Sequence, residues 1–304
     1  MAENRKQGDV NMVKRLFIFA GYNRDGIIDN TLVDYLNFLS PLGDIILTMD
    51  SDVPAHELKK LKSIPNLLSV AAARHGEYDF GSYKRGLKRA GDTLKKYDWV
   101  YLVNDSVYCI SSPRAALEKL ESSRADYVGM IGHYDDTQLF AGYNESWFIG
   151  FNKKIMACNF IQNLISGVTH RDHKWEIVAR YEKRIGTLVT ENGFRHTCLI
   201  NQIDELTAYT APIETCGMGL PFVKKRAMPY VQNKYDLLQF MDGEIYDNIK
   251  HNIGKQKRKY PYGFRFKLFN RIPLFYIERS FDGTIGRMLL FGRIPVAVWR
   301  HHKK

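Results

Sequence analysis

Polar residues of the kinds that bind phosphate, hydroxyl groups or divalent cations follow three short apolar runs of the sequence. Asp50-Ser51-Asp52 comes after DIILTM, the loop RHGEYDFGSYK (74–84) comes after LLSVAA, and Asn104-Asp105-Ser106 ends the run WVYLVN. Carboxylates at such positions can hold Mg²⁺ or Mn²⁺ against a diphosphate, because hard cations prefer oxygen ligands. We therefore take Asp105 as a candidate metal ligand. Helix capping or a turn is the alternative for each of these aspartates.

The loop 74–84 combines glycine, aspartate, serine and cations in one strand-to-helix connection. Gly81 permits close backbone approach, Ser82 and the helix N-terminus can donate hydrogen bonds to phosphate, and Arg74 and Lys84 can neutralise its charge. Asp79 can accept a hydrogen bond from a nucleobase or a ribose. The alternative is a capped helix with a solvated basic face. The phosphate motifs GxxxxGK[ST] and GxGxxG are absent from the sequence, as is HExxH.

Strand-like and helix-like segments alternate through the first half of the chain. The apolar runs at 16–22, 44–49, 67–72 and 99–104 are typical of buried parallel strands. Between them the sequence predicts a helix capped by Asp29 or Asn30, a helix near 54–62 and a helix that includes Tyr83 and Leu87. Such units predict an α/β fold with a mostly parallel sheet. Ligands bind these sheets outside the carboxyl ends of the strands, where the polar clusters are expected to meet.

After residue 125 the pattern is less regular. YVGMIG (127–132) and SWFIGF (146–151) are strand-like and KKIMACNFIQNLI (153–165) predicts one helix, so we expect mixed rather than regular winding.

No CxxC pair occurs, which argues against a zinc knuckle or a disulfide framework. We interpret all four cysteines as buried free thiols: Cys109, Cys158, Cys198 and Cys216.

The net charge lies in one segment. The chain has 304 residues, of which 45% are hydrophobic and 25% charged, and a formal charge of +11. Residues 251–304 hold 13 Lys/Arg and 2 Asp/Glu, whereas residues 1–250 hold 31 of each kind. A nucleic-acid surface along the whole chain is therefore not expected, and no nucleic-acid partner is predicted. We divide the chain into a flexible N-terminus (1–13), a catalytic domain (14–250, with halves near 14–125 and 126–250) and a basic-aromatic segment (251–304).

The basic-aromatic segment interleaves ten aromatic residues with its cations. Lys and Arg beside anionic headgroups, with Phe, Trp and Leu at the interface, fit a protein that lies on the inner membrane leaflet. A packed C-terminal subdomain and RNA binding are the alternatives. The sequence has no apolar run of the roughly 18 residues that a membrane span needs, and no signal peptide. We therefore expect a cytoplasmic protein, peripheral at the inner membrane.

Several blocks of the sequence carry a family resemblance. FAGYNRDGIIDNTLVDYLNFLSPLGDIILTMDSD, RHGEYDFGSYKRGL and YDWVYLVNDSVYCISSP resemble, in order and spacing, the rhamnan synthesis protein F family of bacterial polysaccharide glycosyltransferases. ADYVGMIGHYDD, NESWFIGF and RYEKRIGTLVTENGF resemble the family's next blocks, so the likeness covers about residues 15–200. It implies a nucleotide-binding domain related to the GT-A type and sugar transfer from a nucleotide-sugar onto a cell-wall, capsule or O-antigen glycan. RHGEYDFGSYK departs from the expected family pattern, which has an asparagine and a further glycine.

The resemblance also implies roles for residues of a donor site. It places Gly21 and Tyr22 beside the nucleobase and Asp105 at the metal or sugar position. It places Asp79, Ser82 and Lys84 near the ribose or the diphosphate. The remaining donor-binding candidates are Asp52, Arg74 and Asn104.

Sugar transfer requires stabilisation of a diphosphate leaving group and, in inverting enzymes, a carboxylate that deprotonates the acceptor hydroxyl. Glu182 is the candidate base because it opens a predicted helix behind the aromatic block, although a first-turn Glu can also stabilise a helix dipole. The other candidates are Asp135 and Asp136 as bases and His133 and Trp147 as acceptor contacts, while His170 and His173 are interpreted as surface polar residues.

The sequence thus predicts a cytoplasmic glycosyltransferase that moves a hexosyl or rhamnosyl group from a nucleotide-sugar onto a glycan or lipid-linked glycan acceptor. Its expected place of work is the anionic inner membrane surface, and Mg²⁺ or Mn²⁺ is the candidate cofactor. Two alternatives stay open. A transferase of the same fold could use Lys84 and Arg74 in place of the metal, or the chain could be a non-catalytic scaffold or nucleic-acid-binding protein that uses its basic segment.

Overall fold

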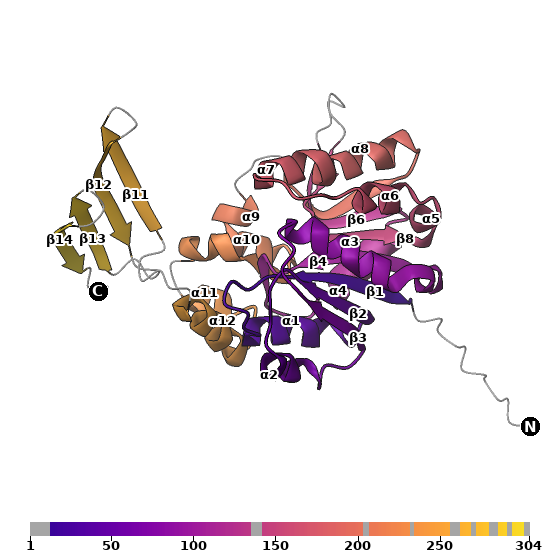
Figure 1. Ribbon diagram of the computed structural model, residues 1–304, viewed down its shortest axis with the longest axis horizontal. Coiled ribbons are helices and arrows are strands. Elements are labelled where there is room, and N and C mark those ends of the chain that lie inside the picture. Colours follow the sequence, from indigo (N-terminus) through magenta and orange to yellow (C-terminus); the bar gives the residue numbers. More distant parts are fainter. Residues whose placement is uncertain are drawn as a thin grey trace, which may run out of the picture.

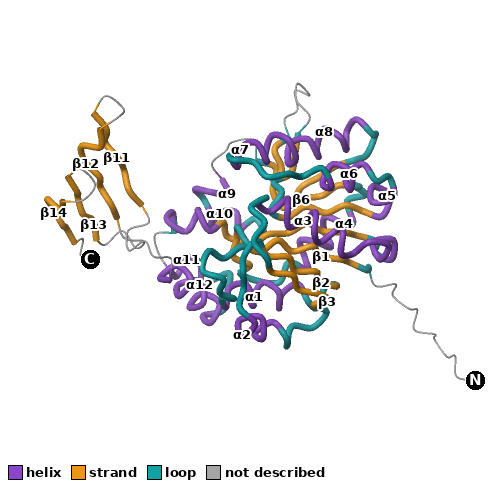
Figure 2. Tube along the Cα trace, in the orientation of Figure 1, coloured by secondary structure: helices purple, strands orange, loops and turns teal. Residues whose placement is uncertain are grey.

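The computed structural model describes residues 13–134, 142–202, 207–231, 234–255, 262–268, 272–279, 285–290 and 294–300. The predicted flexible N-terminus lies outside the described residues except for Val13. Helices cover both faces of a central sheet, and the chain runs from one element to the next through loops that gather at the edges of that sheet (Figures 1 and 2).

The central sheet has the strand order β3-β2-β1-β4-β8-β6-β7, with β9 paired to β6. β1 is parallel to β2 and β4, and β2 is parallel to β3, whereas β8 is antiparallel to both β4 and β6. The predicted α/β fold with a mostly parallel sheet is therefore confirmed. Its strands are β1 (Arg15–Gly21), β2 (Asp44–Met49), β3 (Leu67–Ala72), β4 (Trp99–Asn104), β6 (Tyr127–His133), β7 (Tyr143–Asn144), β8 (Phe148–Asn152) and β9 (His196–Asn201).

The central strands are apolar on both faces because each face is covered. On β1, Phe17 and Phe19 belong to the hydrophobic cluster on one side of the sheet, and Leu16 and Ile18 belong to the cluster on the other side. All four side chains are fully buried. A strand buried on both faces has a continuous apolar sequence rather than an alternating one, which is why this strand could be recognised from the sequence.

The first helix begins where its sequence predicts. The Asp29 carboxylate accepts the Leu32 N–H at 3.1 Å and so caps α1, which buries Leu32, Leu36 and Leu39. The predicted helix near 54–62 is a short α-helix followed by a 3₁₀ turn. The helices of this half are α1 (Asn30–Leu39), α2 (Ala55–Leu58), α3 (Tyr78–Ala90) and α4 (Arg114–Ser122), with 3₁₀ turns at Lys59–Leu61 and Gly91–Lys96.

Two helix predictions in the second half are wrong. Residues 153–165 do not form one helix, because Asn159 adopts a left-handed conformation with φ of 60° between α5 and α6. Glu182 does not open a helix either, since it ends a π-helical stretch (Val178–Glu182) that joins α7 to α8. The bounds are α5 (Lys153–Ala157), α6 (Phe160–Ser166), α7 (Lys174–Ile177) and α8 (Lys183–Glu191).

The cysteines are free thiols, as predicted, but only two of them are buried. Cys109 and Cys216 are buried, whereas Cys198 is half-buried and Cys158 is exposed. Burial raises the pKa of Cys198 to about 11 and that of Cys216 to about 12. These two thiols are therefore protonated at neutral pH, and the prediction of burial is wrong for Cys158, which lies in the exposed turn that follows α5.

The segment after residue 202 packs against the first half of the chain. β10 pairs with β5 in antiparallel fashion, and α12 packs on α1, where Asn248 Nδ2 donates to Asp34 Oδ2 at 2.9 Å. Residue 250 therefore lies inside a helix that is attached to the body. The elements of this segment are α9 (Thr207–Thr210), α10 (Pro212–Gly217), β10 (Phe222–Lys224), a 3₁₀ turn (Lys225–Tyr230), α11 (Lys234–Leu238) and α12 (Gly243–Lys255). β5 (Val107–Cys109), the partner of β10, belongs to the first half of the chain.

The basic-aromatic segment contains a second sheet in which each strand pairs antiparallel with the next in sequence. It consists of β11 (Tyr262–Leu268), β12 (Ile272–Arg279), β13 (Ile285–Leu290) and β14 (Ile294–Arg300). Figure 1 shows it apart from the central sheet. On β14, Ile294, Val296 and Val298 are exposed. Within the described ranges, no helix has the length and apolar character needed to cross a membrane.

The packing of α3 on the sheet leads to the first prediction. A Cβ at Gly86 would lie 2.3 Å from Ile18 Cγ2 on β1, so we expect Gly86→Ala to lower the free energy of unfolding by about 1–3 kcal/mol through overpacking, despite the better helix propensity of alanine. Urea denaturation measures the change. Gly217→Ala in α10 is the matched control, because a Cβ there meets no described atom within 4 Å. Equal stability of the Gly86 variant and wild type would contradict this close approach.

Candidate active site

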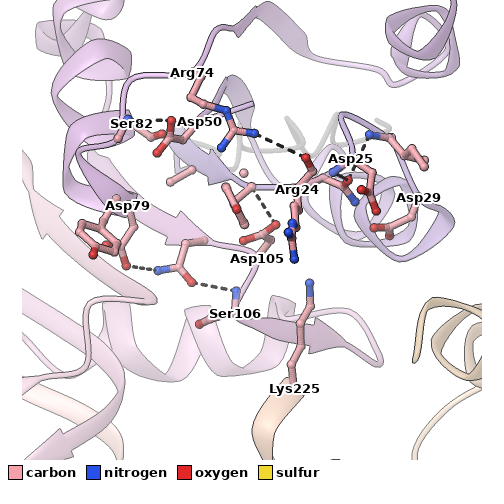
Figure 3. A pocket seen from close by; sticks show the side chains of 18 of the residues that line it. Arg24, Asp25, Asp29, Asp50, Arg74, Asp79, Ser82, Asp105, Ser106 and Lys225 are labelled. Carbon is pink, nitrogen blue, oxygen red and sulfur yellow. Dashed lines mark hydrogen bonds between the residues drawn. The ribbon is translucent and has the colours of Figure 1, made fainter. Parts of the chain in front are cut away.

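A cleft of about 1040 Å³ opens where the carboxyl ends of β1, β2 and β4 meet the start of α3 (Figure 3). Of the predicted donor-site residues, seven line it: Gly21, Tyr22, Arg74, Asp79, Ser82, Asn104 and Asp105. The polar clusters that follow separate strands are therefore brought together. Their individual roles stay predictions, but their position at the carboxyl edge is the one that open α/β sheets use for ligands.

Asp105 is held at the end of β4 by the neighbouring strand. Its Oδ2 accepts the backbone N–H of Tyr22 at 2.9 Å, and its own N–H donates to the Ala20 carbonyl at 3.2 Å. Burial raises the pKa of Asp105, although the ammonium of Lys225 and the Tyr22 N–H act in the opposite direction. The cleft thus contains a fixed carboxylate whose affinity for a proton exceeds that of an ordinary aspartate.

Asp79 has one satisfied and one unsatisfied oxygen. Its Oδ2 accepts from Asn104 Nδ2 at 2.9 Å, and Asn104 Oδ1 in turn accepts the Ser106 N–H at 3.0 Å. Asp79 Oδ1 is buried and has no hydrogen-bond partner. Since a buried acceptor without a donor is costly, this oxygen is suited to an O–H or N–H group of a ligand in the cleft.

Asp50, His75 and Ser82 resemble a nucleophilic triad in residue type, but their hydrogen bonds exclude that chemistry. The Glu77 N–H donates to His75 Nδ1 at 3.1 Å, so the ring proton must be on Nε2, which lies 3.0 Å from Ser82 Oγ. His75 therefore donates to the serine and cannot remove its proton. The Ser82 hydroxyl hydrogen remains available for a ligand acceptor, because the residue lines the cleft.

The cleft also receives a cation from the second half of the chain. Lys225 follows β10, its N–H donates to the Ser106 carbonyl at 3.1 Å, and its ammonium lies 5.3 Å from the centre of the Tyr108 ring. Figure 3 shows its side chain pointing toward Asp105. Lys225 was not a candidate from the sequence, because no local pattern links position 225 to a strand end 120 residues earlier.

Further cations lie along the rim. Arg24 and Lys174 line the cleft together with the predicted Arg74, which lies over the Tyr22 ring at 5.9 Å. His170 also lines the cleft, with Nδ1 at 2.6 Å from the Gly76 carbonyl. His170 is exposed, as its interpretation as a surface polar residue requires, and it also lies at the rim of the cleft. Arg24 and Lys174 were not candidates from the sequence, which shows their charge but not that they lie near the strand ends.

Two predicted donor contacts lie elsewhere. The Lys84 ammonium donates to the Val168 carbonyl at 2.6 Å and lies 3.3 Å from a Glu77 carboxylate oxygen, so it connects α3 to a neighbouring loop rather than facing the cleft. Asp52 accepts the Arg74 N–H at 3.0 Å and does not line the cleft. A phosphate contact by Lys84 is not supported, because Lys84 follows Ser82 by two helical residues and its side chain therefore lies on nearly the opposite face of α3.

The predicted acceptor residues belong to a buried charged cluster built around Glu145. Its carboxylate binds Lys224 Nζ at 2.7 Å, Trp147 Nε1 at 2.7 Å and His133 Nε2 at 3.2 Å. Burial alone would raise the pKa of Glu145, but Lys224 and His133 hold it at about 2. Trp147 and His133 are therefore committed to this carboxylate and do not line the cleft.

Of the candidate bases from the second half, only Glu182 lies in the described residues, and it does not line the cleft. Glu182 is half-buried and accepts hydrogen bonds from the N–H and the hydroxyl of Ser146. Burial raises the pKa of Glu182 against these two bonds. To act as a base Glu182 would need access to the cleft, but it is not among the residues that line the cleft. Asp135, like Asp136, lies outside the described residues.

The carboxylates of the cleft do not fit a resident divalent cation. Asp50 accepts two backbone N–H groups, from His75 at 2.6 Å and Gly76 at 2.9 Å, and one oxygen of Asp79 and one of Asp105 are similarly occupied. The remaining oxygens are not gathered, and within the described ranges no three His, Cys, Asp or Glu side chains are placed to hold a metal. A cation provided by Lys225 already stands beside Asp105.

Comparisons with known proteins bear on the same region. The model of the rhamnan synthesis protein F family matches residues 45–253, which include most of the cleft. No curated protein matches the chain.

Several solved structures are similar at low identity. One, described as a candidate nucleotide-diphospho-sugar transferase from Desulfovibrio desulfuricans G20, is 17% identical over 80% of this chain and 96% of its own, with a TM-score of 0.40. The glycosyltransferase GlyE of Streptococcus pneumoniae TIGR4 is 13% identical over 81% and 64%, with a TM-score of 0.42. Core-mannan synthase A of Aspergillus fumigatus, in an Mn/GDP form, is 8% identical over 53% and 64%, with a TM-score of 0.32. The chain spans less than two thirds of the last two.

The Glu145 cluster leads to a prediction about stability and pH. Glu145→Gln should lower the free energy of unfolding at pH 7 by about 3–5 kcal/mol, because it leaves the Lys224 charge buried and unpaired. The pKa of Glu145 lies near 2 in the folded protein, below its ordinary value of 4.5. Its stabilisation is therefore complete above about pH 5 and is lost as pH falls toward 2.

The gap in stability between wild type and Glu145→Gln should thus narrow on acidification, which urea denaturation at pH 7 and near pH 3 would measure. Glu191→Gln is the control. Glu191 pairs with Arg184 at 3.2 Å with both side chains about half exposed, so its loss should cost under about 1 kcal/mol. A constant gap across this pH range would contradict the ionised pair.

Proposed function

The chain belongs to the rhamnan synthesis protein F family, and from this premise we propose that it is a glycosyltransferase that moves a sugar from a nucleotide-sugar donor onto a cell-surface polysaccharide of the rhamnan, capsule or O-antigen type. One observation carries the proposal. The half-buried carboxylates of Asp79 and Asp105 and the ammonium of Lys225 share a cleft at the carboxyl edge of the sheet. This set can bind both a polyhydroxyl group and a diphosphate.

The nucleoside end of the donor suits the side of the cleft formed by β1 and α3. The exposed ring of Tyr22 offers a face on which a nucleobase can stack, at the end of β1. The free Oδ1 of Asp79 can accept a ribose hydroxyl or a base N–H, and the Ser82 hydroxyl can donate to an oxygen of the same ligand. The cleft volume of about 1040 Å³ is sufficient for such a molecule.

The diphosphate suits the part of the cleft near Asp105, where Lys225 and Arg24 lie (Figure 3). During transfer the bond between the anomeric carbon and the diphosphate oxygen breaks, and negative charge grows on the departing diphosphate. Cations already in place at that oxygen lower the barrier, because they need no reorganisation. Lys225, Arg24 and Lys174 supply these charges. The proposal therefore takes the metal-independent alternative, with Lys225 in the place that the sequence analysis gave to Lys84.

Asp105 is the proposed base. In an inverting transfer, an acceptor hydroxyl attacks the anomeric carbon while its proton passes to a carboxylate. Asp105 is fixed by the Tyr22 N–H, lies in the cleft, and has a pKa raised by burial, which improves it as a proton acceptor. Glu182 and Glu145 lack this access because Ser146 and Lys224 occupy them.

The test of the proposal is release of nucleoside diphosphate from UDP-, GDP- and dTDP-sugars. Asp105→Asn should reduce kcat/KM by a factor of about 10²–10⁴, the usual contribution of a general base, while donor binding and the fold persist. Asp25→Asn is the matched control, because Asp25 lines the same cleft but is exposed. The rate should be unchanged by EDTA. No release from any donor would favour a non-catalytic scaffold, and loss of activity in EDTA would restore the metal.

We further propose that the enzyme acts at the cytoplasmic face of the inner membrane, held there by the basic-aromatic segment. The segment carries all of the net charge of +11, and its β14 exposes Ile294, Val296 and Val298. Cations near an anionic surface contribute about 1 kcal/mol each, and this contribution falls with salt. The acceptor would then be a glycan linked to membrane lipid.

The charge-reversed variant Lys257→Glu, Arg258→Glu, Lys259→Glu tests this attachment. We expect it to bind vesicles containing anionic lipid at least about tenfold more weakly, because reversing three charges lowers the net charge of the segment by six units. Cosedimentation measures the binding, and neutral vesicles are the control. Equal binding to anionic and neutral vesicles would exclude an electrostatic anchor, and a preference for RNA at the same salt would assign the segment to nucleic acid.

A further inference from the structure

Two adjacent lysines at the end of β10 have opposite environments. Lys224 is buried against Glu145, with both side chains 8% exposed, whereas Lys225 lines the cleft. We propose that the buried Glu145–Lys224 ion pair positions Lys225 as the cation that binds the donor diphosphate. The proposal rests on the proposed function, and it makes Glu145 and Lys224 positioning residues rather than catalytic ones.

The pair is held from several sides. Besides Lys224, the Glu145 carboxylate accepts from Trp147 Nε1 at 2.7 Å and lies 3.2 Å from His133 Nε2. The Lys224 ammonium lies 4.7 Å from the centre of the Trp147 ring and 5.1 Å from that of Tyr209. Separating the pair would leave a charge without a partner in a buried site, which is strongly unfavourable. Residue 224 therefore has one position in the fold.

The position of Lys224 also determines where the backbone of the next residue, Lys225, lies. β10 pairs with β5 so that Lys224 lies opposite Val107, and the Lys225 N–H then donates to the Ser106 carbonyl at 3.1 Å. Ser106 is the next residue after Asp105. The backbone of Lys225 is thus fixed on one side by the ion pair and on the other by the strand end that carries the proposed base.

The ion pair is connected to the cleft by a second route. Glu145 lies two residues before Trp147, whose carbonyl accepts the Asn104 N–H at 2.9 Å. This backbone hydrogen bond therefore connects the segment that carries Glu145 to the end of β4. A shift of the pair would move the cation and the carboxylate relative to each other, and a displacement of about 1 Å in a catalytic site is enough to reduce turnover strongly.

If the Glu145–Lys224 pair only stabilised the fold, its loss would affect ligand binding no more than the loss of another buried ion pair. Arg15 and Glu121 form a comparably buried ion pair, at 2.6 Å with side-chain exposures of 10% and 8%. Arg15 begins β1, so that pair lies at the amino edge of the sheet, opposite the cleft. Glu121→Gln is therefore a matched control that removes a buried ion pair without touching the cleft.

The experiment measures the affinity of UDP, GDP and dTDP, and of the corresponding nucleosides, by calorimetry on the full chain. Lys225→Ala should weaken the nucleoside diphosphate that binds best by about tenfold and leave its nucleoside unchanged, because only the diphosphate meets the cation. Glu145→Gln should do the same. The double variant Glu145→Gln, Lys225→Ala should lose no more than Lys225→Ala alone, since both changes remove one interaction.

Lys224→Met provides a second route to the same result. It breaks the pair while Glu145 keeps the Trp147 and His133 contacts, so it serves if Glu145→Gln does not fold. Glu121→Gln should lower stability without changing affinity. Additive losses in the double variant, or unchanged diphosphate affinity in folded Glu145→Gln and Lys224→Met, would overturn the positioning role while leaving the proposed function intact. Wild-type protein that binds none of the nucleoside diphosphates would overturn the proposed function and this inference together.

Discussion

The need to satisfy carboxylates withdrawn from water organises one edge of this protein. Asp50 is buried and Asp105 is half-buried. Both follow strands of the central sheet, and each accepts a backbone N–H from a loop that belongs to another strand: His75 and Tyr22 respectively. A carboxylate withdrawn from water requires such donors. These hydrogen bonds offset the cost of withdrawing the carboxylates from water, and they also connect the loops that line the cleft.

The antiparallel insertion of β8 explains why the second half contributes to this edge. In a parallel sheet only carboxyl ends meet at the ligand side, but the amino end of an antiparallel strand reaches the same side. β8 pairs with β4 in this way, so the residues just before it, Glu145 to Trp147, come to the end of β4. The Asn104 N–H donates to the Trp147 carbonyl as a result. A break in the regular winding thus supplies the anchor of the site.

Sequence patterns predicted the parts of the fold that depend on local periodicity. β1 and α1 are continuous apolar or amphipathic runs with recognisable ends, and Asp29 caps its helix as expected. Side-chain direction was not predictable in the same way. Lys84 lies in a loop-to-helix segment rich in phosphate-binding residue types, yet its helical position carries it to Val168. Lys224 and Lys225 are equivalent as letters in FVKKRA, and only the pairing of β10 with β5 determines which one is buried.

The distribution of charge in the cleft also orients its ligand. Lys225 and Arg24 lie on the side of Asp105, whereas the free oxygen of Asp79 lies beside α3, where Asn104 holds its partner oxygen. A diphosphate placed against Asp79 would be repelled and would satisfy no acceptor, because phosphate oxygens cannot donate. A hydroxyl or N–H group placed there completes the carboxylate. A molecule that carries both kinds of group therefore has one favourable direction, with its uncharged polar end toward α3 and its anionic centre toward Lys225.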